Sequence, residues 1–100
     1  MLTKSEARAL VVAELGRQQE RGYASAPKDL VVVDEATIER PWGWVFFYNS
    51  KRFLETRDFL HALAGNAPPF IVNRHTGEMR ATGTAYRTEH YIAEYERSLR

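Results

Sequence analysis

Histidines are the side chains of this chain most able to bind a metal ion or transfer a proton, and their spacing supports neither role. His75 falls at the tip of an expected hairpin, and His61 and His90 fall on expected helices without a metal-ligand partner one turn away. None belongs to a zinc-binding pattern such as H-E-x-x-H. The chain has no cysteine, which excludes thiol catalysis and thiolate metal ligands. We therefore expect solvated histidines and no metal site.

Other chemical motifs give the same answer. The sequence contains no G-x-S-x-G elbow, no P-loop and no dinucleotide-binding fingerprint. Asp34, Glu35 and Glu39 form a local acidic group that is able to hold a cation, but they lack the spacing of an EF-hand. Charge runs usually cover a solvated face of a protein. We therefore expect a protein that is not an enzyme and that uses no cofactor.

The residues before the central aromatic segment indicate binding to another protein. Trp42 stands beside Pro41, and Arg40 and Glu39 precede them. Trp and Arg are enriched in binding hot spots, because a rigid ring desolvates a large area and a guanidinium makes several hydrogen bonds. Trp42, Arg40 and Glu39 are our candidate partner-binding residues. The alternative is that Trp42 caps the core and that Arg40 pairs with an acidic neighbour.

Composition bounds the class of protein. The 100 residues are 44% hydrophobic and 12% aromatic, which suffices for a core without disulfides. Fourteen basic and thirteen acidic residues give a net charge of +1, which argues against a nucleic-acid partner. No apolar run approaches the roughly 20 residues of a membrane span, and the N-terminus lacks the pattern of a secretory signal. We expect one cytoplasmic domain over residues 1–100 that binds no membrane.

Helix signals lie at both ends of the chain. Residues 4–21 predict a helix that begins with a capping box, in which Thr3 and Glu6 bond each other's backbone amides. Its apolar stripe consists of Ala7, Leu10, Val11 and Leu15. A final helix is predicted to begin at Thr88-Glu89. Its apolar stripe consists of Tyr91, Ile92, Tyr95 and Leu99.

Strand signals lie between the helices. The segment 30–33 predicts a strand, and 37–40 is expected to continue it after a bulge or bend. Residues 44–50 give the strongest strand signal. Alternation sends Trp44, Phe46 and Tyr48 to one face and Val45, Phe47 and Asn49 to the other, with Phe46 and Phe47 expected in the core. A hairpin joins 70–72 to 78–82, and its loop needs Gly77 at positive φ.

The connecting segments are less regular. Residues 24–28 and 65–69 are expected to be loops, and 53–63 is either a short helix or still partly extended. The order of elements indicates an α+β fold: an N-terminal helix, a curled antiparallel sheet of about four to five strands, and a C-terminal helix packed on one face. We expect both helices to share that face.

Several blocks resemble the immunity protein 35 family, also called YrhB-like domains. The blocks are Thr37 to Ser50, Leu63 to Val72, Thr76-Gly77-Glu78, Gly83-Thr84-Ala85, and the closing residues Glu89, Tyr91, Ile92 and Tyr95. They occur in family order and reach from about residue 30 to residue 96. The resemblance implies a small α+β immunity protein of a bacterial polymorphic toxin system.

That resemblance also implies how such a protein works. Family members neutralise a cognate toxin of the producing cell by binding it, and their toxins include peptidase-type domains. The family has no established catalytic residues, so the resemblance assigns none to this chain. A chaperone-like binder of unfolded proteins is a second non-enzymatic interpretation, and it requires an exposed apolar patch. An enzyme of unknown type is a third, and it requires a pocket with convergent titratable groups.

Overall fold

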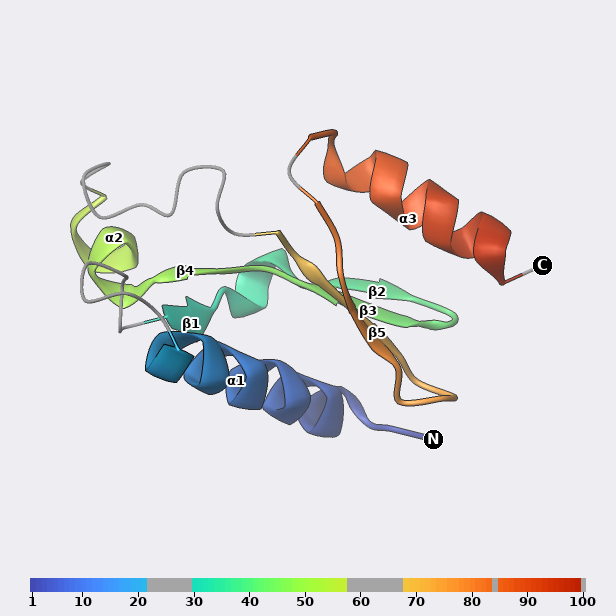
Figure 1. Cartoon of the computed structure of the whole chain (residues 1–100), viewed down its shortest axis with the longest axis horizontal. Helices are drawn as coiled ribbons and strands as arrows, with labels where there is room; N and C mark the ends of the chain where they lie inside the picture. The colour runs from blue at the N-terminus through green and yellow to red at the C-terminus, as the bar shows by residue number, and fades with distance from the viewer. Residues whose placement is uncertain (22–29, 58–67, 84, 100) are drawn as a thin grey trace.

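The structure is a computed structural model that describes residues 1–21, 30–57, 68–83 and 85–99 (Figure 1). Its elements, in order, are α1 (Lys4–Arg21), β1 (Leu30–Val32), the 3-10 turn η1 (Asp34–Ala36), β2 (Ile38–Arg40), β3 (Gly43–Phe46), β4 (Tyr48–Ser50), α2 (Lys51–Thr56), β5 (Phe70–Asn73), β6 (Met79–Ala81) and α3 (Thr88–Ser98). The α+β class is confirmed. No helix in the described ranges is long and apolar enough to cross a membrane.

The strands form two antiparallel sheets. One has four strands in the order β2-β3-β5-β6, and the other pairs β1 with β4. The prediction that 37–40 continues the strand at 30–33 is therefore wrong, because η1 separates two strands that belong to different sheets. The expected strand 44–50 is likewise divided at Phe47. The Val33 N–H donates to the Phe47 carbonyl at 2.9 Å, so the segment from β1 to β2 and the segment from β3 to β4 both change sheet at this level.

The central strand β3 is buried on both of its faces. Trp44 and Phe46 join Tyr48 in one cluster, and Val45 joins Phe47 in the other, as the alternation predicts. Ala7, Val11 and Leu15 of α1 cover the first face, and Ile92 and Tyr95 of α3 cover the second. The helices consequently lie on opposite sides of the strands, and our expectation that they share one face is wrong (Figure 1).

Helix α1 is fixed at its start and along its length. The predicted capping box is present, with Thr3 N–H to Glu6 Oε1 at 2.9 Å and Glu6 N–H to Thr3 Oγ1 at 3.2 Å. Arg8 donates to both carboxylate oxygens of Asp34 at 2.7 and 3.1 Å, and this contact lowers the pKa of the Asp34 carboxyl. Leu10 is exposed, so the buried stripe is narrower than predicted.

The remaining local predictions have mixed outcomes. Phe53 and Leu54 are helical in α2, whose start is capped by Ser50 Oγ accepting from the Phe53 N–H at 3.0 Å. The hairpin is confirmed, with Gly77 at φ 75°. Helix α3 is confirmed, but Leu99 is its exposed C-cap and does not belong to the buried stripe. The predicted loop at 24–28, most of 65–69 and residues 58–63 lie outside the described residues.

Gly43 should tolerate no side chain. It lies at φ 154°, and an added Cβ would overlap the Val72 carbonyl oxygen of the neighbouring strand. We expect Gly43→Ala to lower the free energy of unfolding by at least about 2 kcal/mol in urea titrations. The matched control is Gly16→Ala inside α1, where an added Cβ meets nothing within 4 Å. That change should raise stability by about 0.5–1 kcal/mol, and equal effects of the two changes would contradict our account.

Phe46 and Phe47 test the assignment of the two faces. Phe46 is 0% exposed, whereas Phe47 is only partly buried at the edge of its cluster. Phe46→Ala should cost about 3–5 kcal/mol, because it leaves a cavity in a packed core, and Phe47→Ala should cost less. The measurement is the melting temperature of each variant. If both keep the parental value, the core has been misplaced.

Candidate functional site

Trp42, the foremost sequence candidate, lies inside the molecule. It is 8% exposed, its ring meets Tyr95 edge-on with centroids 4.9 Å apart, and its Nε1–H donates to Glu96 Oε2 at 3.0 Å. It belongs to the same cluster as Ile92. Trp42 thus caps the core beneath α3, which is the alternative left open by the sequence. Its role as a partner anchor stays a prediction.

Arg74 brings the other two candidates together. Its Nη2 lies 3.2 Å from Glu39 Oε2 and donates to the Arg40 carbonyl at 2.9 Å, while its guanidinium lies over the Trp44 ring. The Arg40 guanidinium donates to the Glu39 backbone carbonyl at 3.2 Å. The expected pairing of Arg40 with an acidic side chain is therefore replaced by an Arg74–Glu39 pair. Sequence reasoning missed Arg74, whose position at a hairpin tip carried no signal for this role.

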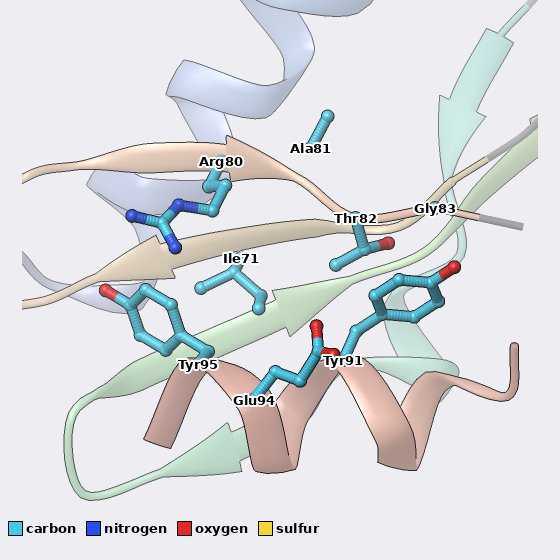
Figure 2. Close-up of a pocket in the computed structure, with 8 residues that line it drawn as sticks. All are labelled: Ile71, Arg80, Ala81, Thr82, Gly83, Tyr91, Glu94 and Tyr95. Atoms are coloured by element: carbon cyan, nitrogen blue, oxygen red, sulfur yellow. The ribbon is translucent and has the colours of Figure 1, made fainter. Parts of the chain in front are cut away.

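A groove lies between α3 and the β5–β6 hairpin. It has a volume of about 450 Å³ and is lined by Ile71, Arg80, Ala81, Thr82, Gly83, Tyr91, Glu94 and Tyr95. Figure 2 shows Ile71 in the middle of the groove, with Arg80 and Tyr95 at one end and Tyr91 at the other. Both the strand and the helix contribute side chains. The groove therefore depends on how α3 sits against the sheet.

Charges in the groove are balanced. The Arg80 guanidinium lies 5.2 Å from the centre of the Tyr95 ring, and its Nη2 lies 3.2 Å from Glu78 Oε2. The Tyr95 hydroxyl accepts from Asn73 Nδ2 at 3.0 Å and donates to Glu78 Oε1 at 3.2 Å; burial raises the pKa of this hydroxyl. Glu94 pairs with His90 at 2.9 Å. Both charged side chains of the groove are therefore paired, and the groove carries no excess charge of either sign.

Three aromatic rings cluster at the start of α3, next to the groove. Tyr86 is 64% exposed, its ring centroid lies 4.4 Å from that of His90, and the His90 and Tyr91 centroids lie 5.6 Å apart. The Tyr91 hydroxyl accepts the N–H groups of Ala85 and Tyr86 at 3.1 and 3.2 Å. Ordered surface rings of this kind lose little entropy on binding and are typical of protein-binding hot spots.

Gly83 makes room for this arrangement. A Cβ added at Gly83 would lie 2.5 Å from the Tyr91 hydroxyl oxygen, so the Tyr91 ring would have to move. The glycine lets the Tyr91 ring press against the chain that follows β6. The sequence placed Tyr91 in the apolar stripe of the final helix and Gly83 in a block that resembles the family, and it did not single out Tyr86. Their proximity depends on the packing of α3, which no local pattern records.

The other chemical candidates, the histidines and the acidic residues, have different outcomes. His75 is exposed, as expected, and His61 lies outside the described residues. The expectation that His90 lacks a ligand-type partner one turn away is wrong, because Glu94 occupies that position. Across the described ranges, no three His, Cys, Asp or Glu side chains converge in a way that would hold a metal ion. Asp34 and Glu39 of the η1–β2 region instead pair with Arg8 of α1 and Arg74 of the β5–β6 turn.

Substitution of Trp42 separates its packing from its hydrogen bond. Trp42→Ala should cost about 3–5 kcal/mol of folding free energy, because it removes a buried ring. Trp42→Phe keeps a ring against Tyr95 and loses the bond to Glu96, and it should cost about 1–2 kcal/mol. Urea titrations of both variants measure the difference. A Trp42→Ala variant as stable as the parent would show that the ring does not support α3.

Comparisons with known proteins place this chain in a family. The family described as Immunity protein 35 matches residues 5–95, so the match reaches further toward the N-terminus than the blocks that first showed the resemblance. "Uncharacterized protein YrhB" of Escherichia coli (strain K12) is 46% identical over 54 residues, which are 54% of this chain and 56% of that protein. The alignment thus spans little more than half of that relative's length. No solved structure matches significantly. The chain belongs to the immunity protein 35 family.

Proposed function

We propose that this protein binds a cognate bacterial toxin and neutralises it by protein–protein contact, without catalysing a reaction. The observation that carries the proposal is the family match, which spans residues 5–95 and names an immunity function. The toxin belongs to a polymorphic toxin system, and a peptidase-type domain is the toxin class that the family resemblance favours. Neutralisation takes place in the cytoplasm of the producing cell.

The face made by the groove and the three rings is the best-suited contact surface of the described residues. Tyr86 offers an exposed ring that its neighbours already hold in place. Around it stand the His90–Glu94 and Arg80–Glu78 pairs, which provide polar contacts at the rim. An aromatic centre with a polar rim is the usual anatomy of a protein interface. Glu39, 65% exposed in its side chain, lies at the far end of the β2–β3 hairpin and is a secondary candidate.

A chaperone-like role finds less support. Within the described ranges, the exposed large hydrophobic residues are Met1, Leu10, Val12, Tyr86 and Leu99. They are distributed over the N-terminus, α1 and both ends of α3. A binder of unfolded chains needs a contiguous apolar patch of several hundred Å². Scattered single residues are ordinary on a protein surface and do not favour this alternative.

Co-expression tests the proposed function. We expect the toxin to be the C-terminal domain of a long secreted protein encoded by a gene adjacent to that of this chain. We expect cells that express this domain to survive only when the immunity protein is present, and we expect the two purified proteins to form a complex in calorimetry. Survival would be restored by binding alone, so the toxin should be recovered chemically unchanged. Full lethality of every adjacent toxin in the presence of the protein would overturn the proposal.

Tyr86→Ala tests the contact surface. The side chain is mostly exposed, so its removal should leave the melting temperature unchanged. Affinity for the toxin domain should fall by about 2 kcal/mol, which is the size of a hot-spot effect. Leu99→Ala is the matched control, because Leu99 is 48% exposed at the opposite end of the same helix. Equal affinity of the Tyr86→Ala variant and the parent would place the interface elsewhere.

A further inference from the structure

Strand β6 presents unpaired backbone groups along one edge of the four-stranded sheet. Register and hydrogen bonds identify them: the Thr82 N–H donates to the Pro69 carbonyl and the Asn73 N–H to the Glu78 carbonyl, both at 2.9 Å. Residues 78, 80 and 82 therefore turn their backbone groups toward β5, and Met79 and Ala81 turn theirs outward. Within the described part of the chain, nothing pairs with these outward groups.

On the opposite edge of the same sheet, β2, an outward backbone carbonyl has a side-chain partner. The Arg74 N–H donates to the Trp42 carbonyl at 2.8 Å, which places Trp42 and Trp44 among the residues bonded toward β5. Alternation then directs the backbone groups of Glu39 outward from β2. The guanidinium of Arg40 already donates to the Glu39 carbonyl. Covering an outward carbonyl with a charged side chain is a common way to protect a sheet edge, and β6 lacks this cover among the described residues.

The groove runs beside the open edge, on the face that β6 shares with α3 (Figure 2). Side chains of neighbouring strands that lie opposite each other point to the same face of a sheet. A strand added along β6 would therefore direct the side chain opposite Arg80 to the face of the sheet that carries the groove, next to the Arg80 side chain. The charged groups that line the groove already have partners, Arg80 in Glu78 and Glu94 in His90, so the charges balance. This balance fits an uncharged side chain on an extended peptide.

We propose that β6 is the docking edge for an extended segment of the toxin, which joins the sheet as an added strand. Backbone bonds to Met79 and Ala81 hold the segment, and one uncharged side chain of the segment fills the groove beside Arg80. The exposed ring of Tyr86 flanks the far end of the groove. The inference rests on the proposed function for the identity of the partner, while the mode of binding follows from the open edge itself. Strand addition is a recurring mode of peptide recognition.

Ala81→Pro removes one outward N–H without removing a bond to β5, since only residues 78, 80 and 82 bond inward. Ala81→Ser is the matched control, because it keeps the N–H. Two probes are used with each variant: the toxin domain encoded by the adjacent gene, and short peptides selected from a random display library on the parent protein. We expect Ala81→Pro to bind both probes about tenfold more weakly or worse, and Ala81→Ser to bind like the parent.

Amide hydrogen exchange supplies a second measurement that does not depend on the folding of the proline variant. The amides of Met79 and Ala81 should exchange quickly in the free protein and become protected in the complex with either probe. Unchanged exchange at both amides, or equal binding by Ala81→Pro and the parent, overturns the docking edge.

The two probes also separate this inference from the proposed function. If the selected peptides bind as expected and the toxin domain does not bind the parent, the docking edge is supported and the proposed partner is wrong. If the toxin domain binds while the Met79 and Ala81 amides stay unprotected, the proposed function stands and the docking edge is wrong. If the parent binds neither the toxin domain nor any peptide, the docking edge is wrong.

Discussion

The burial of β3 on both faces is the constraint on which the rest of the structure depends. Trp44 and Phe46 on one side and Val45 on the other are almost completely shielded from water. A single helix covers only one face of a sheet, so a strand of this composition requires a layer on each side. Helix α1 supplies one layer and α3 the other. Gly43 permits the close approach of β5 that this central strand needs.

Local signals in the sequence predict the elements well, because local interactions create them. Thr3 and Glu6 form the cap that their spacing predicts, and Gly77 takes the positive φ that its hairpin requires. Alternation also assigns the faces of the central strand correctly. The division into two sheets was not predictable, because it depends on which strands pair, and β1 pairs with β4, which is distant from it in sequence. The placement of α3 opposite α1 is likewise a tertiary effect, since either face of the sheet is apolar enough to receive a helix.

The surface residues show the same contrast more strongly. Trp42 is a residue type that is typical of binding anchors. Its Nε1–H nevertheless donates to a carboxylate on α3 and its ring packs against Tyr95, so the side chain is buried. Tyr86 has no distinctive sequence context, yet the Tyr91 hydroxyl fixes the chain around it. Single-residue chemistry does not distinguish these outcomes. What decides them is which side of α3 each residue meets, and that is known only once the helix is packed.

One consequence of the layered architecture concerns how its motions become visible. The chain has two tryptophans, and each lies in a different cluster: Trp44 with α1 and Trp42 with α3. The indole of Trp42 lies against a carboxylate and a phenol ring, whereas that of Trp44 lies beneath a guanidinium. The protein therefore contains a separate intrinsic fluorophore for each side of its sheet. Detachment of α3 alone would change the emission of Trp42 and leave the emission of Trp44 unchanged, whereas global unfolding would change both. Fluorescence should therefore distinguish local opening from global unfolding.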